Sequence, residues 1–96
     1  MATRHLWRGL KEPFLLETVE VPKPSLNQTQ NLLAGNVRRL REKLHWTQEQ
    51  AADAIGIVPR HYQKIEAGDV NVTVATLVRV AKAFRVPVKS LFEDEA

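Results

Sequence analysis

Signals that begin and end helices recur at short intervals in the second half of this chain, and they constrain its fold more than any other feature. Thr47, followed three residues later by Gln50, is a capping box that marks the start of a helix. Gly56 ends that helix, and Pro59 is favoured at the first position of another because its missing N–H needs no partner there. Gly68 ends the second helix. These signals predict two short helices joined by a tight turn.

Apolar residues repeat at helical spacing on both sides of this pair. Before it, four residues at i, i+4, i+7 and i+11 form one face of a first helix: Leu33, Val37, Leu40 and Leu44. Ser25 and Asn31 are alternative N-caps for that helix. After the pair, Thr73 caps a helix whose buried face holds Leu77, Val80, Ala81 and Phe84. Residues 88–92 predict a last short helical turn, so the expected fold is all-α, with five helices and no sheet.

The first thirty residues differ in character from the rest. Pro13, Pro22 and Pro24 are spaced so that no helix can run through them. The segment between them fits a short strand or an extended arm that docks on the domain, pairs with another chain or stays mobile. The predicted organisation is an extended or disordered N-terminal arm, a helical domain and an acidic tail, over residues 1–30, 31–92 and 93–96.

Composition excludes several classes of function. The chain has no cysteine, which rules out disulfides, a thiolate nucleophile and sulfur-ligated zinc. No apolar run approaches membrane-spanning length, so a cytoplasmic setting without membrane contact is expected. The scattered Ser, Thr and His residues show no triad, metal-ligand or phosphate-loop spacing. We therefore expect no enzyme activity, no metal and no cofactor.

Charge is distributed unevenly along the chain. Residues 31–92 hold ten Lys and Arg against five Asp and Glu, a net +5, whereas three acidic residues follow in the tail. This balance favours a polyanionic partner, although a solvated surface is the commoner cause of such a balance.

Several runs of residues resemble the phage repressor and Cro type of helix-turn-helix, the xenobiotic response element family. They are Leu40-Arg41-Glu42, the run from Trp46 to Ala52, Ile65-Glu66-Ala67-Gly68 and the run from Leu77 to Phe84. The likeness covers about residues 33–92 and is specific because the motifs recur in order and at the family's spacing. It implies a sequence-specific regulator that binds double-stranded DNA as a homodimer, in most cases a repressor acting on a near-palindromic operator.

The resemblance also implies roles for individual residues. Gln48 sits where family members hydrogen-bond a DNA phosphate, and Thr47 and Lys64 are the further phosphate candidates. Arg41 and Glu66 match an arginine and a glutamate that pair inside the domain, so this ion pair is expected to be structural.

The predicted helix after Pro59 has a polar outer face that is a candidate for reading bases. Tyr62 and Ile65 are expected to point inward, and Trp46 is expected to pack at a helix junction. The outer face carries Arg60, His61, Gln63 and Lys64. Arginine can bond guanine O6 and N7, glutamine can bond adenine N6 and N7, and lysine can bond guanine or a phosphate. Arg60 is the first candidate because it lies at the amino end, which penetrates the groove deepest.

Two residues depart from the family pattern. Val58 stands where a Ser or Thr usually caps the recognition helix, and Pro59 occupies a position that often supplies a polar base contact. The chain should therefore read fewer base edges, or depend more on thymine methyls and DNA shape. Two alternatives stay open: an antitoxin whose residues 1–30 bind a protein partner, and a controller of a restriction-modification operon.

Overall fold

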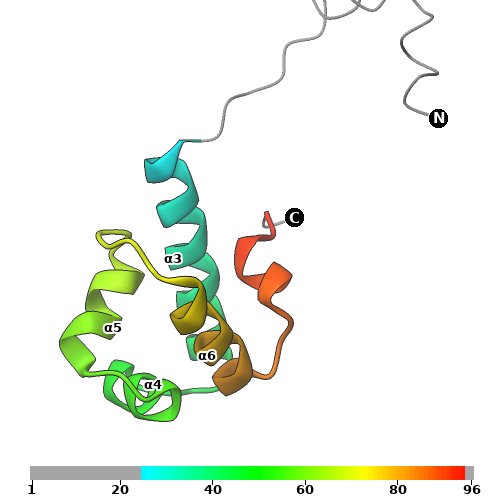
Figure 1. Cartoon of the computed structure of the whole chain (residues 1–96). Coiled ribbons are helices and arrows are strands. Elements are labelled where there is room, and N and C mark those ends of the chain that lie inside the picture. Colours follow the sequence, from blue (N-terminus) through cyan, green and yellow to red (C-terminus); the bar gives the residue numbers. More distant parts are fainter. Residues whose placement is uncertain (1–24, 95–96) are drawn as a thin grey trace, which may run out of the picture.

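The computed structural model describes residues 25–94, which form four α-helices and a closing 3₁₀ helix (Figure 1). The helices are α3 Leu26–Lys43, α4 Gln48–Ile55, α5 Pro59–Glu66, α6 Val74–Phe84 and η1 Val88–Phe92. The described residues contain no strand, which confirms the all-helical class. The expected count of five α-helices is wrong, because the last segment is five residues long and closes with an i to i+3 bond from the Ser90 N–H to the Pro87 carbonyl. Residues 1–24 of the predicted arm, which spans residues 1–30, lie outside the described residues.

Helix α3 begins earlier than the predicted domain boundary at residue 31. The Ser25 hydroxyl accepts a hydrogen bond from the Gln28 N–H at 3.0 Å, so Ser25 rather than Asn31 is the N-cap. Residues 26–30, which were expected to belong to the arm, are helical. At the other end α3 stops at Lys43, and Leu44 is 44% exposed instead of buried because the chain leaves the helix there.

The turn between α4 and α5 has the predicted chemistry at each end. Thr47 and Gln50 form both halves of the capping box, so the first turn of α4 is held by side chains. Gly56 adopts a left-handed conformation with φ 91° and donates its N–H to the Ala52 carbonyl. Pro59 is at the start of α5, whose N-cap Val58 supplies no side-chain hydrogen bond. Residue 56 thus needs glycine for the chain to turn here.

The core lies where α3, α4, α5 and α6 meet (Figure 1). Its fully or nearly buried apolar residues are Leu33, Val37, Ala51, Ala52, Ile55, Tyr62, Ile65, Val80, Ala81, Phe84 and Leu91. Trp46 packs on Phe84 with ring centroids 5.8 Å apart, which confirms its predicted packing role. Leu40 and Leu77, which were expected in the core, are half-buried at its edge.

Asn36 fastens the C-terminal end of the domain to α3. It is 1% exposed, and its side-chain amide donates to the carbonyls of Leu91 and Glu93, each at 2.9 Å. These bonds hold η1 against α3 (Figure 1). Sequence reasoning missed this residue, which sits beside Val37 on the buried face of the helix. None of the helices in residues 25–94 is long and apolar enough to cross a membrane.

Candidate functional site

Helix α5 has one face in the core and one face in solvent. Tyr62, Ile65 and Glu66 are buried, as their spacing on one side of the helix requires. The opposite side exposes Arg60, Gln63 and Lys64, three of the four residues predicted to face outward. Within residues 25–94 neither Arg60 nor Lys64 is paired with a carboxylate.

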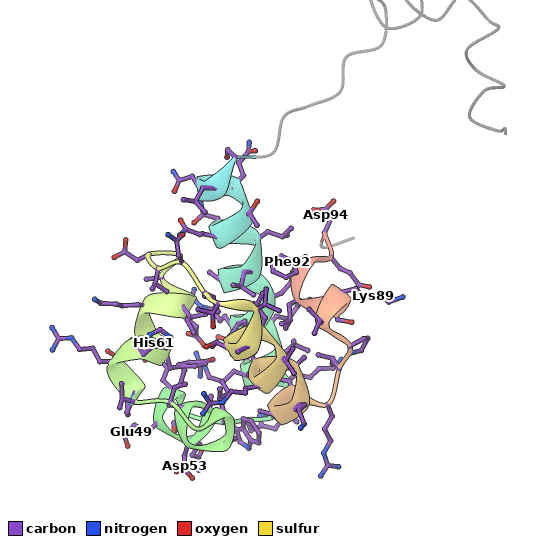
Figure 2. The ribbon with its side chains drawn as sticks, in the orientation of Figure 1. Glu49, Asp53, His61, Lys89, Phe92 and Asp94 are labelled. Atoms are coloured by element: carbon purple, nitrogen blue, oxygen red, sulfur yellow. The ribbon has the colours of Figure 1, made fainter. Side chains whose placement is uncertain are left out.

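His61 is the exception among the four predicted readers. It is half-buried, so the expectation that it lies fully on the outer face is wrong. Figure 2 shows it on α5. Its position between the two faces places it at the edge of the exposed surface.

The buried carboxylate of Glu66 joins three helices. Its side chain is 2% exposed and accepts hydrogen bonds from Arg41 of α3, at 2.6 Å to Nε and 3.2 Å to Nη2. Gln48 of α4 donates through Nε2 at 2.9 Å, and the Tyr62 hydroxyl of α5 donates as well. The predicted contact between Arg41 and Glu66 is therefore present, and it is part of a larger network.

The network sets the protonation states of its members. Burial raises the pKa of Glu66, but the hydrogen bonds from Arg41, Tyr62 and Gln48 outweigh it, and the net pKa lies below the ordinary value of 4.5. The hydrogen bond to Glu66 raises the pKa of Arg41. Burial and the same carboxylate raise the pKa of Tyr62, so its hydroxyl stays a donor. Glu66 and Arg41 are thus charged at neutral pH.

Arg41 also fixes the connection that leads into α4. Its Nη1 donates to the Trp46 carbonyl at 2.8 Å, just before the capping box begins. Arg41 and Glu66 therefore help to tie α5 to α3 and to the segment that leads into α4.

The predicted phosphate-contacting residues of α4 lie at its amino end. Gln48 is half-buried, and its contact with Glu66 uses one of the two N–H donors of its amide. Thr47 accepts from the Gln50 N–H through its hydroxyl, which keeps its own O–H as a donor. Both side chains can therefore still donate to an anion.

Sequence reasoning missed three contacts that shape this region. The bond between Tyr62 and Glu66 joins residues at i and i+4 of one helix, so this spacing was a usable signal. The bond from Gln48 to Glu66 and the bond from Arg79 Nη2 to the Gly56 carbonyl, 2.7 Å long, join residues far apart in the chain. No local sequence pattern predicts contacts between such distant residues.

The exposed surface offers hydrogen-bond donors and positive charge. No group of three or more His, Cys, Asp or Glu in the described part of the chain could hold a metal ion. The side chains on the α5 face supply a guanidinium, an amide and an ammonium, which are the groups that bond base edges and phosphates. Such a face can donate hydrogen bonds to a polar, anionic partner.

Comparisons with known proteins agree with the arrangement of two short helices joined by a tight turn. The helix-turn-helix family HTH_3 matches residues 37–91. The chain has no significant match among curated proteins. Three solved structures share the fold. An HTH_3 family transcriptional regulator from Vibrio cholerae is 20% identical with a TM-score of 0.67, over 71% of this chain and 38% of that one.

The other two structures are closer to this chain in length. A hypothetical transcription factor, NHTF, from Neisseria is 23% identical with a TM-score of 0.67, over 78% of this chain and 86% of that one. The restriction-modification controller protein C.AhdI from Aeromonas hydrophila is 24% identical with a TM-score of 0.64, over 66% of this chain and 96% of that one. The chain thus spans well under half of the Vibrio regulator but most of the other two.

The Glu66 network makes stability depend on acidity in a predictable way. Since the folded pKa of Glu66 lies below 4.5, its contribution is complete above the unfolded pKa and is lost as pH falls through the folded pKa. Glu66→Gln should lower the free energy of unfolding at pH 7 by about 3 kcal/mol, because Arg41 keeps a charge without its partner. Urea unfolding followed by circular dichroism measures the free energy of unfolding of the parent chain and of Glu66→Gln.

Repeating the unfolding measurement at several pH values shows whether the loss of stability arises from this carboxylate. The difference in unfolding free energy between Glu66→Gln and the parent chain should shrink as the pH falls below 4.5 and through the lowered pKa of Glu66, since the parent then loses the charged partner too. Glu42→Gln, at an exposed position of α3, is the control and should change stability by less than about 0.5 kcal/mol. A deficit in Glu66→Gln that is the same at every pH would contradict the assignment.

Proposed function

Since the chain belongs to the HTH_3 family of DNA-binding helix-turn-helix regulators, we propose that it binds double-stranded DNA at specific sequences and represses transcription from an operator. One observation carries the proposal. Arg60, Gln63 and Lys64 share the exposed face of α5, while the opposite face is anchored in the core by Tyr62 and Glu66. A helix held in this way presents its polar side chains outward, as a recognition helix does when it enters the major groove.

The three exposed polar residues of α5 each suit a partner in the groove. Arg60, near the amino end of the helix, bonds guanine O6 and N7 through its guanidinium. Gln63 bonds adenine N6 and N7, and Lys64 one turn after Arg60 bonds guanine or a phosphate. His61, at the edge of the face, reaches a phosphate rather than a base.

The amino end of α4 holds the DNA backbone. Gln48 donates its second amide N–H to a phosphate while its first stays bonded to Glu66. Thr47 donates its hydroxyl beside it. Because Gln48 touches both the phosphate and the carboxylate that anchors α5, the backbone contact fixes the depth of the recognition helix.

A homodimer is the proposed working form. Three valines on α6 and η1 stay exposed: Val74 at 75%, Val78 at 42% and Val88 at 37%. Val74 and Val78 lie at i and i+4, on one side of α6. Burying this apolar surface in a symmetric contact would present two α5 helices to half-sites about one helical turn apart.

A controller of a restriction-modification operon is a second candidate within the same activity. C.AhdI is such a controller, and the chain covers 96% of it with the same fold. The antitoxin alternative depends on residues 1–30, most of which lie outside the described residues. DNA binding through α5 is common to all three proposals.

The reading role of Arg60 can be measured on two kinds of DNA. Arg60→Ala should cost about 1–3 kcal/mol of affinity for a selected specific duplex and little for random duplex, because a base contact is lost. Log affinity of the parent chain should fall steeply with log salt concentration. Fluorescence anisotropy with labelled duplexes gives both quantities.

Lys89→Ala is the charge-matched control for Arg60→Ala. Lys89 is exposed on η1, on the opposite side of the molecule from His61 and α5 in Figure 2. Lys89→Ala removes one positive charge without touching the proposed DNA-binding face of α5 and α4, so it should weaken binding to both duplexes slightly and equally. Equal losses on specific and random DNA for Arg60→Ala would remove Arg60 from the reading role.

The dimer surface is tested by placing a charge on it. Val78→Glu should convert the dimer to a monomer, because an unpaired carboxylate would be buried in the contact. Leu44→Glu is the control, since Leu44 is 44% exposed and Val78 is 42% exposed, but Leu44 lies at the end of α3. Sedimentation equilibrium measures the mass. A parent chain that is monomeric at all concentrations, or a dimeric Val78→Glu, would contradict the proposed surface.

A further inference from the structure

Val58 occupies the N-cap of α5, but its side chain accepts no hydrogen bond from the first turn of the helix. Its backbone is extended, with φ −73° and ψ 149°, the conformation in which a Ser, Thr, Asp or Asn side chain caps the helix. Valine supplies no acceptor, and no side-chain hydrogen bond is made there. The helix therefore begins with a less favourable cap than its geometry allows.

Packing does not account for the valine either. Val58 is 64% exposed, whereas the preceding Ile57 is half-buried against the core. Pro59, the next residue, is also exposed. Val58 and Pro59 together form an apolar edge at the amino end of α5, immediately before Arg60. We call this pair the Val58–Pro59 edge.

We propose that the Val58–Pro59 edge receives the C5-methyl group of a pyrimidine in the major groove, an inference that rests on the proposed DNA binding through α5. Neither side chain can donate or accept a hydrogen bond, and proline has no N–H. The methyl is the apolar group that base edges present in that groove. The edge therefore selects for this methyl and against a bare pyrimidine edge.

The Val58–Pro59 edge lies at the end of α5 that would approach the base edges most closely. The amino-terminal residues of a recognition helix lie deepest in the groove, where base edges are exposed. Arg60 follows the edge directly and carries the guanine-reading role proposed above. The recognised half-site therefore places a methyl-bearing pyrimidine at or beside the guanine that Arg60 reads.

The test begins with duplexes that the full chain selects from a random library. Each thymine of the selected site is replaced by uracil, and each cytosine by 5-methylcytosine, one at a time. Uracil differs from thymine only in lacking the methyl. One thymine per half-site should show a loss of about fourfold on replacement, the effect expected for burying one methyl-sized group. A gain of similar size at one cytosine would identify 5-methylcytosine as the methyl source.

Val58→Ser separates reading from stability. Serine can cap α5, so the thermal midpoint should rise by about 4–8 °C. The same change removes the valine half of the Val58–Pro59 edge, so the affinity ratio between methylated and unmethylated pyrimidine should fall from about four towards 1. Leu26→Ala is the control, because Leu26 is 62% exposed at the start of α3 and should leave the ratio unchanged.

The outcomes distinguish this inference from the function on which it rests. If no sequence is selected, DNA reading by this chain is overturned, and the methyl contact with it. If a site is selected but every methyl can be removed or added with less than a twofold change, the methyl contact alone is overturned. The methyl contact is also overturned if Val58→Ser keeps the parent ratio. A methyl effect at one position that Val58→Ser reduces at least twofold and Leu26→Ala retains supports the proposal.

Discussion

The buried carboxylate of Glu66 is the interaction on which this domain depends. A charge with 2% exposure is stable only if its hydrogen-bonding capacity is filled, and here Arg41, Gln48 and Tyr62 fill it from three helices. The small core formed by α3 to α6 leaves the angles between short helices to be set by few contacts. The carboxylate supplies those contacts at the point where α3, α4 and α5 meet.

Within the single short helix α5, the residues that pack in the core are different from the residues proposed to read bases. Every third or fourth residue of α5 is committed to the interior, so the remaining positions can vary without loss of the fold. The exposed positions carry Arg60, Gln63 and Lys64. Gln48 belongs to both systems, because its amide is anchored on Glu66 while it faces the proposed phosphate position. The proposed contact with the DNA phosphate and the proposed contacts with the bases are thereby linked through Glu66.

Much of this could be predicted from sequence because the signals are local. The capping box at Thr47, the left-handed turn at Gly56 and the proline at the start of α5 act within a few residues, and the structure has them all. The buried Asn36 and the bond from Arg79 to the Gly56 carbonyl could not be predicted, since their partners come from distant segments. The winding of η1 was also missed, because five residues at a helical period fit either kind of helix.

The central claim is that the exposed face of α5 meets the major groove. Chemical-shift mapping by NMR, with the isotope-labelled chain titrated with a selected duplex, tests it most directly. We predict the largest changes at the amides from Thr47 to Lys64 and contacts between the Arg60 side chain and base protons. Large changes confined to the first turns of α3 or to η1, with α5 unaffected, would contradict the account.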